Sequence, residues 1–166
     1  KLSDRMRKET EEENGLIDKG VYDLTFNAGK PLKAPPKKDP VPHIAFAGVK
    51  NSLGDLQISV KQLQSVIDET DFTKLTTGQL QKIDKMVYQS ERFLTDARGL
   101  PRRPWFKHFI YAPGFYTGYG VKTLPAIREA IEERKWQEVV DQEMITSEVL
   151  NRYSKHLSNI ADELKR

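Results

Sequence analysis

Cysteine is absent from the 166 residues, and histidine is scarce, with three in all. Without cysteine the chain forms no disulfide and holds no metal through thiolates. The absence leaves the redox compartment open, because cysteine-free domains function inside and outside the cell. His43, His108 and His156 lie far apart and match no metal-ligand spacing such as H-E-x-x-H. We therefore expect no metal site and no catalytic residue in this chain.

Long apolar runs are also missing. A membrane-spanning helix needs about 20 consecutive apolar residues, and the apolar runs here are only a few residues long. The chain opens on the charged run KLSDRMRKE, which is typical of the middle of a helix and not of a signal peptide. We therefore expect the chain to be part of a longer protein, and we expect no membrane contact by this segment.

The net charge is mildly positive, at +3, from 27 Lys and Arg against 24 Asp and Glu. The basic residues cluster locally at Lys30, Lys33, Lys37 and Lys38 and again at Arg102 and Arg103. No helix face combines a Lys/Arg stripe with aromatic residues, so we interpret the charges as solvated surface and expect no nucleic-acid partner. A basic module that binds anionic partners is the alternative.

Helical periodicity covers most of the chain. A helix is predicted over residues 1–20, before Gly20 stops it. Two further helices, at 52–68 and 78–96, are predicted to form an antiparallel hairpin, with Thr76 or Thr77 as the cap. The first of these carries an apolar stripe at Leu53, Leu56, Val60, Leu63 and Ile67, and the second at Leu80, Ile83, Val87 and Leu94.

Two more helices are predicted towards the C-terminus. One covers residues 124–133 and is capped by Thr123, and the other, the longest, covers 135–165. Together the patterns predict a single all-α domain over 1–166, a four-helix-bundle-like fold with a long ordered loop rich in proline and aromatic residues.

Proline shapes the segment between the first two helices. Five prolines and four lysines lie between Lys30 and Pro42, which favours an extended, polyproline-like path. We interpret residues 21–47 as a strap across the surface, and a flexible linker fits the composition equally well. Val41, Ile44 and Phe46 suggest that the end of this segment is attached to the core.

The central loop, residues 97–122, belongs to a stretch from Arg98 to Ile127 that holds four of the nine prolines and a dense run of aromatic residues. Its aromatic content argues against disorder. We expect Trp105, Phe106, Phe109 and Tyr111 to turn inward and join the helical hairpin to the C-terminal helix. On this expectation Trp105→Ala lowers the unfolding midpoint sharply, whereas Tyr119→Phe does not.

The same stretch carries a family motif. GLP-x-RP-[WF]-[FY]-[KR]-H-x-IYAP begins at Gly99, and LPAI opens the next helix at Leu124. The pattern resembles the C-terminal helical domain shared by transferrin receptors and glutamate carboxypeptidase II-type metallopeptidases of the M28 family. The N-terminal third resembles fungal members. The motif residues that we expect to fix the loop's structure are Arg103, Trp105, Phe106, His108, Tyr111 and Pro113.

The resemblance implies a non-catalytic dimerisation domain. In the family this domain forms much of the homodimer interface and leans against the catalytic domain, so the expected partners are a second copy and the protease-like and apical domains of the parent. The two zinc ions of the peptidases belong to a separate protease domain. The resemblance also places the parent's domains outside the cell or in the vacuolar lumen, attached to a membrane anchor.

The family's substrate-selecting loop corresponds to GFYTGYG, residues 114–120. In glutamate-preferring members a lysine and then a tyrosine hold the substrate carboxylate. Here Tyr119 matches the tyrosine, Gly118 stands at the lysine position, and Lys122 is a candidate substitute. The alternative function is therefore the substrate-selecting part of an active zinc peptidase, although Tyr116 and Tyr119 equally fit a role in packing the loop.

A Ser-His-Asp arrangement of Ser90, His108 and Asp96 is the other catalytic possibility. The sequence contains no G-x-S-x-G turn to present the serine. We therefore interpret His108 as a packed residue of the loop.

Overall fold

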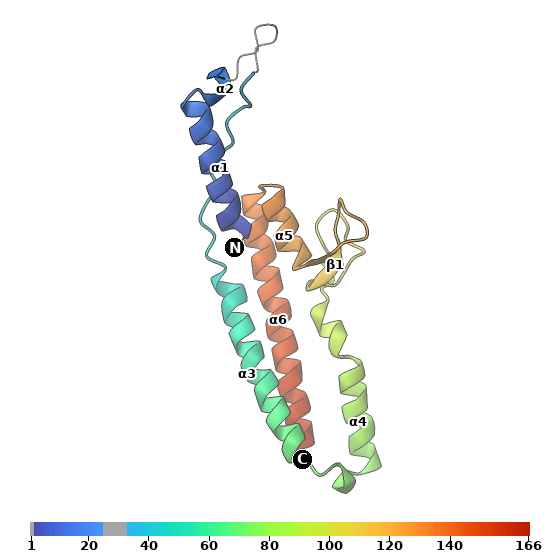
Figure 1. Ribbon diagram of the computed structural model, residues 1–166. Coiled ribbons are helices and arrows are strands. Elements are labelled where there is room, and N and C mark those ends of the chain that lie inside the picture. The colour runs from blue at the N-terminus through green and yellow to red at the C-terminus, as the bar shows by residue number, and fades with distance from the viewer. Residues whose placement is uncertain (1, 25–32) are drawn as a thin grey trace. The chain divides into compact units, whose positions relative to one another are not determined.

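The structure is a computed structural model that describes residues 2–24 and 33–166 (Figure 1). The chain divides into two compact units, Lys1–Ala45 and Phe46–Arg166, where the sequence predicted one domain. Helices dominate both units. Within the described residues, no helix is long and apolar enough to cross a membrane.

The first unit consists of two helices and the end of the proline-rich strap. Helix α1 covers Leu2–Asp18, and the short helix α2, at Val21–Leu24, lies where an extended strap was predicted. Residues 33–45 have no regular structure. The Nε and Nη2 atoms of Arg7 donate to the carbonyls of Val41 and Pro42 over 3.1 and 2.8 Å. These bonds attach this part of the strap to α1, while residues 25–32 lie outside the described part.

The second unit is organised on α6, Trp136–Leu164, and on α3, Ala47–Glu69, which runs beside it in the same direction (Figure 1). Small polar residues line this contact. The hydroxyls of Ser59 and Ser154 lie 2.7 Å apart, and the Val49 N–H donates to Glu143 Oε1 over 2.9 Å. Short side chains let the two helices approach closely.

Helix α4, Thr77–Tyr88, follows the short 3₁₀ helix η1, Phe72–Lys74, and leads into a second one, η2, Ser90–Leu94. Thr76 caps α4 through a capping box with Gln79, as the sequence predicted. The predicted hairpin is different in the structure, because α3 and α4 each pack against α6, which lies between them (Figure 1).

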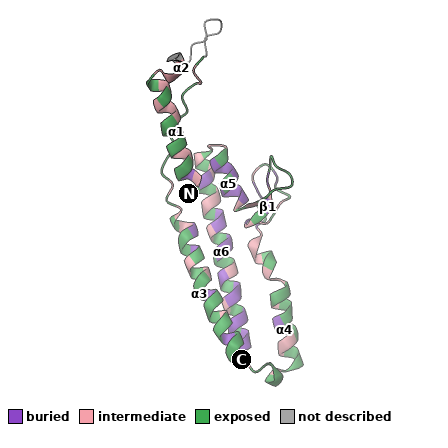
Figure 2. Cartoon of the chain, viewed as in Figure 1, coloured by how far each residue is buried: buried purple, intermediate pink, exposed green. Residues whose placement is uncertain are grey.

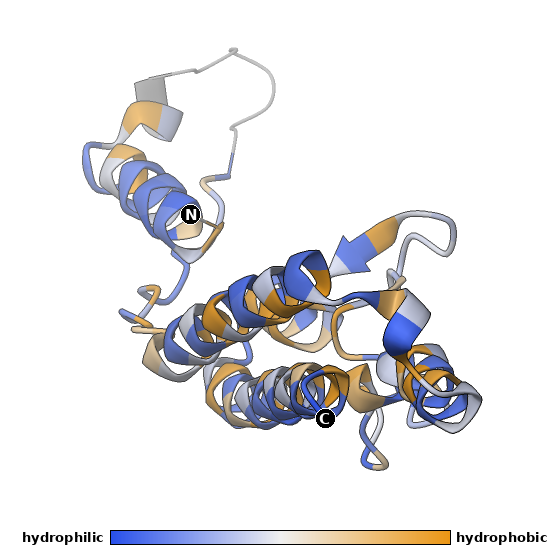
Figure 3. Ribbon diagram, turned by 90° about the horizontal axis from the view of Figure 1, so that it is seen from below, coloured by the Kyte–Doolittle hydropathy of each residue, from blue (hydrophilic) through white to orange (hydrophobic). Residues whose placement is uncertain are grey.

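One apolar cluster explains this arrangement. It joins Val66 of α3 and Ile83 of α4 to Leu157, Ile160, Ala161 and Leu164 of α6. Helix α6 has apolar residues on two sides. Each of α3 and α4 therefore makes more apolar contact with α6 than the two helices make with each other. Buried residues are accordingly concentrated along α6 (Figure 2). In the view from below, hydrophobic residues in the second unit lie mostly where its helices face one another (Figure 3).

The predicted loop contains a small antiparallel sheet. Strands β1, Tyr111–Pro113, and β2, Val121–Thr123, pair with Tyr111 opposite Thr123. The fold is therefore mostly helical and not purely α. Helix α5, Pro125–Glu132, follows with Pro125 in its first turn. Leu124 occupies the N-cap position at φ 50° without a side-chain cap, so Thr123 does not cap this helix.

Phe109 is the buried aromatic residue of the loop, with no exposed surface. It clusters with Leu100, Ala112, Ala126 and the α6 residues Ile145 and Val149. The expectation for Trp105 was wrong, because 71% of that residue is exposed. Tyr111 is half-exposed, and Phe106 is partly buried. Backbone pairing of Leu100 N–H with Phe106 O closes the turn that leaves Trp105 at the surface.

We predict that Phe109→Ala lowers the free energy of unfolding by about 3–5 kcal/mol, because apolar contacts are lost and a cavity remains. Trp105→Ala should change it by about 0.5 kcal/mol or less, as is usual for exposed positions. Urea unfolding of both variants provides the comparison. Equal losses would show that Phe109 is not the anchor of the loop.

Candidate functional site

A buried ion pair holds the central loop together. Arg103 Nη2 lies 2.7 Å from Glu129 Oε1, and the two side chains are 4% and 2% exposed. Arg103 Nη1 also donates to the carbonyl of Pro113, at the end of β1. The guanidinium lies 5.2 Å from the centre of the Phe106 ring, in the geometry of a cation–π contact. The pair therefore connects the motif's arginine, strand β1 and helix α5.

The same carboxylate fixes the start of the segment between the strands. Glu129 Oε1 accepts a hydrogen bond from the Phe115 N–H over 2.8 Å. At the other end of the motif, Gly99 has φ +68°, and a Cβ there would come within 2.2 Å of the Pro104 carbonyl oxygen. Only glycine fits this turn. The motif therefore needs its glycine for the backbone conformation and its arginine for the buried ion pair.

Tyr119 lies in the connection between β1 and β2 and is fully exposed. Its hydroxyl and ring interact with none of the residues that the structure describes, so its side chain is available to another domain or to a ligand. Packing of the loop by Tyr119 is therefore not its role within this chain. Tyr116 is also exposed, and its ring meets Phe115 edge-on at 4.9 Å.

Lys122 lies on β2, and its ammonium pairs with Glu132 of α5. The Lys122 side chain is 11% exposed. Burial raises the pKa of Glu132, but the hydrogen bonds from Lys122 and Arg128 outweigh it and hold that pKa below its usual range. The structure therefore separates Lys122, which is engaged and largely covered, from the exposed Tyr119.

Asp96 joins the beginning of the loop to α6. Its carboxylate accepts from Arg98 Nε over 2.7 Å and from both terminal nitrogens of Arg152 over 3.1 Å. The hydrogen bond from Arg98 is the main cause that holds the pKa of Asp96 well below its usual range, and Arg152 adds to it. A carboxylate held in this way is a structural anchor and a poor proton acceptor.

His108 is fixed by the loop backbone. Its Nδ1 accepts from the N–H groups of Ile110 and Tyr111 over 3.3 and 3.2 Å, so the ring proton lies on Nε2. The Nε2 atom is buried and finds no hydrogen-bond acceptor among the described residues, and Glu91 Oε1 is 3.8 Å away. Burial lowers the pKa of His108, and Glu91 only partly opposes the shift. His108 therefore stays neutral at pH 7 and orders the entry to β1.

Ser90 contacts a different histidine from the one the sequence suggested. Its Oγ lies 3.1 Å from His156 Nε2, which is also 3.0 Å from the Met86 carbonyl. A carbonyl can only accept, so this nitrogen carries the proton and cannot take one from Ser90. His156 stacks on Phe93 at 3.9 Å. The contact of Ser90 with the buried His156 is part of the packing between η2 and α6. No pattern in the sequence indicated it, because the two residues are 66 positions apart.

The residues present do not fit a zinc site. In the described part of the chain, no three His, Asp or Glu side chains come together as metal ligands. His156 and His108 each use a ring nitrogen within the fold, as described above. That the parent holds its two zinc ions in a separate domain stays a prediction.

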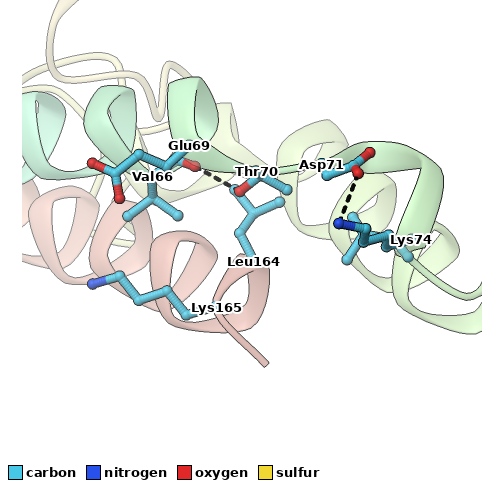
Figure 4. A pocket seen from close by; sticks show the side chains of 8 residues that line it. Val66, Glu69, Thr70, Asp71, Lys74, Leu164 and Lys165 are labelled. Atoms are coloured by element: carbon cyan, nitrogen blue, oxygen red, sulfur yellow. Dashed lines mark hydrogen bonds and ion pairs between the residues drawn. The ribbon is translucent and has the colours of Figure 1, made fainter.

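A hollow of about 340 Å³ lies where α3 and α6 end (Figure 4). Val66 and Leu164 form its apolar wall, and Asp71 and Lys74 its far side. Hydrogen bonds from Thr73 and then Lys74 lower the pKa of Asp71. Asp71 and Lys74 form an ion pair with each other, and the hollow resembles a seam between helix ends more than a catalytic pocket.

Comparison with known proteins identifies the class of domain. The family described as transferrin receptor-like dimerisation domain matches residues 44–158. This is more than half of the chain, and the chain belongs to that family. The match starts close to the boundary between the two compact units, so the family's domain corresponds to the second unit. The resemblance seen in the loop motif is thereby confirmed.

A curated relative supports the connection to carboxypeptidases. The protein named probable glutamate carboxypeptidase LAMP1, from Arabidopsis thaliana, is 41% identical over 56 residues. These residues amount to 34% of this chain and 8% of that protein. The chain thus spans a small part of the relative's length.

We predict that Glu129→Ala lowers the free energy of unfolding by about 3–5 kcal/mol, because it leaves the Arg103 charge buried and unpaired. The matched control is Glu148→Ala, which removes a half-exposed partner of Arg98 and should cost about 1 kcal/mol or less. Chemical denaturation measures both. A Glu129→Ala cost no larger than that of the control would contradict the role of the buried pair.

Asp96 should make stability depend on pH below its ordinary pKa. Its pKa is depressed in the folded state, so its contribution is complete above the unfolded value of 3.8 and is lost as the pH falls below it. We predict a fall in the free energy of unfolding between about pH 5 and pH 2 that is shallower in Asp96→Asn. Urea unfolding across this range tests it, and equal slopes would rule out Asp96 as a source.

Proposed function

We propose that this chain is the non-catalytic dimerisation domain of a glutamate carboxypeptidase-like or transferrin receptor-like protein. On this proposal it forms the homodimer interface of the parent and one wall of its substrate cleft. The observation that carries the proposal is the family match to residues 44–158, which falls on the compact helical unit. A dimerisation domain implies that two copies of the protein associate.

The surface of the helical unit supports this function. Exposed large apolar side chains occur on α3, at Leu53, Val60 and Ile67, and on α6, at Val140 and Met144. Exposed apolar side chains that lie together on one face of a helix are typical of surfaces that meet a partner. The arrangement of the charged and histidine side chains supports a non-catalytic role, because Asp96, Glu129 and His156 are each engaged in holding the fold.

The exposure of Tyr119 favours a second function, selection of the substrate in an active zinc peptidase. The buried Arg103–Glu129 pair holds the base of the segment that carries this tyrosine, so its hydroxyl could donate a hydrogen bond to a substrate carboxylate. Lys122 is a weak candidate for the charged partner, because Glu132 already neutralises it. A parent sequence with a zinc-ligand-bearing protease domain upstream would favour this function, and loss of those ligands would indicate a receptor-like parent.

The basic-module alternative has less support. Lys37 and Lys38 pair with Asp18 and Glu13 of α1. Arg102 pairs with Glu133 and Glu138, and Lys30 lies outside the described residues. Much of the positive charge that suggested an anionic partner is thus matched by carboxylates within the chain. We propose that neither nucleic acid nor a membrane surface is a partner of this segment.

Self-association provides the direct test of the dimerisation function. We predict that the purified 166-residue chain forms dimers in sedimentation equilibrium at high micromolar concentration, because apolar side chains on its helices gain a partner. The same preparation should cleave no peptide, since residues 2–24 and 33–166 bring no three zinc-ligand side chains together. A chain that stays strictly monomeric at these concentrations would contradict the proposal.

A further inference from the structure

The described end of the strap runs back beside α1 and is held there by side chains of that helix (Figure 1). Asn14 pairs with both backbone groups of Lys38. Its Nδ2 donates to the Lys38 carbonyl over 2.8 Å, and its Oδ1 accepts from the Lys38 N–H over 3.0 Å. Arg7 donates to two carbonyls further along, as described above. We name residues 37–42 the latch.

Both lysines of the latch pair with carboxylates of α1. The ammonium of Lys38 pairs with Glu13, and that of Lys37 pairs with Asp18. The second half of α1, residues 9–18, holds five carboxylates and no basic residue, although the C-terminal end of a helix favours positive charge. The latch therefore supplies cations that this half of the helix does not provide itself.

The latch is attached more firmly at its end than at its start. Val41 is buried, and the Arg7 side chain that bonds to its carbonyl is 26% exposed. The side chains of Lys37 and Lys38 are 54% and 49% exposed. Exposed ion pairs contribute little to stability and are screened by salt. The contacts therefore favour local opening around the two lysines.

Two adjacent basic residues in an extended, exposed segment are the substrate of serine endoproteases that require a basic pair. Such an enzyme binds the chain as an added strand, so it needs the backbone groups beside the bond as well as both basic side chains. In the latch, α1 engages these same groups, which are the two ammonium groups and the N–H and carbonyl of Lys38. A closed latch is therefore shielded, and an open one presents a complete recognition sequence.

Four other adjacent basic pairs occur in the sequence, and each lies in a helix or a turn. The pairs at 7–8 and 165–166 belong to α1 and to the last turn after α6. Both N–H groups of the pair at 134–135 donate to carbonyls of α5. The second arginine of the pair at 102–103 is buried, and a proline follows it. The pair at 37–38 is therefore the one that becomes available when a polar contact opens.

We propose that the peptide bond between Lys38 and Asp39 is a processing site for a serine endoprotease that requires paired basic residues, and that α1 shields it while the latch is closed. Cleavage adds water across this bond: the hydroxyl joins the Lys38 carbonyl carbon, and a hydrogen goes to the Asp39 nitrogen. The products carry a new carboxylate and a new amine. The cut leaves residues 1–38 in one chain and the family-matched residues 44–158 in the other.

Cleavage of the full chain by such an endoprotease tests the shielding. When the latch opens and closes faster than it is cut, the cleavage rate follows the population of the open form. Asn14→Ala removes both hydrogen bonds to Lys38 and should raise the rate roughly tenfold. Alanine favours helix more than asparagine does, so the substitution does not weaken α1 itself. Mass spectrometry identifies the bond that is cut.

Glu12→Gln is the matched control. Glu12 is next to Glu13 in the helix, but its carboxylate pairs with Lys8 of α1 and not with the latch. This variant should be cut at the rate of the unaltered chain, whereas Glu13→Gln should be cut roughly two- to fivefold faster, as expected for loss of an exposed ion pair. Equal rates for Asn14→Ala and Glu12→Gln would contradict the shielding.

A free peptide of residues 33–42 provides the unshielded reference. It should be cut at least about tenfold faster than the full chain in low salt, because nothing holds its backbone. Raising the salt from about 0.05 M to about 0.5 M screens both lysine–carboxylate pairs, so the difference between chain and peptide should narrow. The ratio of the two rates removes the effect of salt on the protease.

Two results would overturn the proposal. If the chain and the peptide are cut equally fast in low salt, α1 does not shield the bond. If Asn14→Ala is cut at another basic pair before the bond after Lys38, the latch is not the preferred site. Neither result bears on dimerisation, which sedimentation measures separately.

Discussion

The packing of other elements against α6 is the constraint on which the second unit depends. Helices α3, α4 and α5 and the 3₁₀ helix η2 all contact it. Its C-terminal half carries the cluster around Leu157 and Ile160, and its N-terminal half contributes Ile145 and Val149 to the cluster around Phe109. One continuous helix thus connects the helical pair to the irregular loop. Burial along α6 stabilises both, because apolar surface leaves water on more than one side of the helix.

The loop needs a second kind of support, since it is too irregular to satisfy its polar groups by regular pairing alone. Arg103 and Glu129 supply it from inside. Burying two charges is costly unless they are paired and hydrogen-bonded, and here Glu129 also accepts from Phe115 while Arg103 donates to Pro113. The pair therefore adds little net stability, because the cost of burying the charges offsets their attraction. Its main effect is to hold the loop in one conformation. This matters for the proposed function, because that conformation fixes the base of the segment that presents Tyr119.

The elements that local patterns determine could be predicted from the sequence. Thr76 and Gln79 form the capping box that ends the turn before α4, and the long C-terminal helix follows from its apolar repeat. The family could also be recognised from the loop motif. Its residues have different structural roles, such as the turn at Gly99 and the buried ion pair of Arg103. These signals lie within short stretches of chain, where the physical causes are local.

Features that depend on distant contacts could not be predicted. Four rings were expected to turn inward, and the count of rings gave no indication that Phe109 would be buried while Trp105 stays 71% exposed. The prediction that α3 and α4 form a hairpin was wrong. Both helices pack instead against α6, which lies far along the chain. The contacts of Lys122 with Glu132 and of Ser90 with His156 likewise join residues whose proximity no spacing revealed. Site residues were therefore harder to assign than helices.

Hydrogen exchange in the native state tests most directly whether α6 unites the second unit. If the helix couples the two apolar clusters, amides near Val149 and near Ile160 should exchange with the same opening free energy, equal to that of global unfolding. Added denaturant should lower both values together. Exchange near Val149 through an opening of clearly lower free energy would contradict the account, because the loop and the helical pair would then be separate units that merely share a helix.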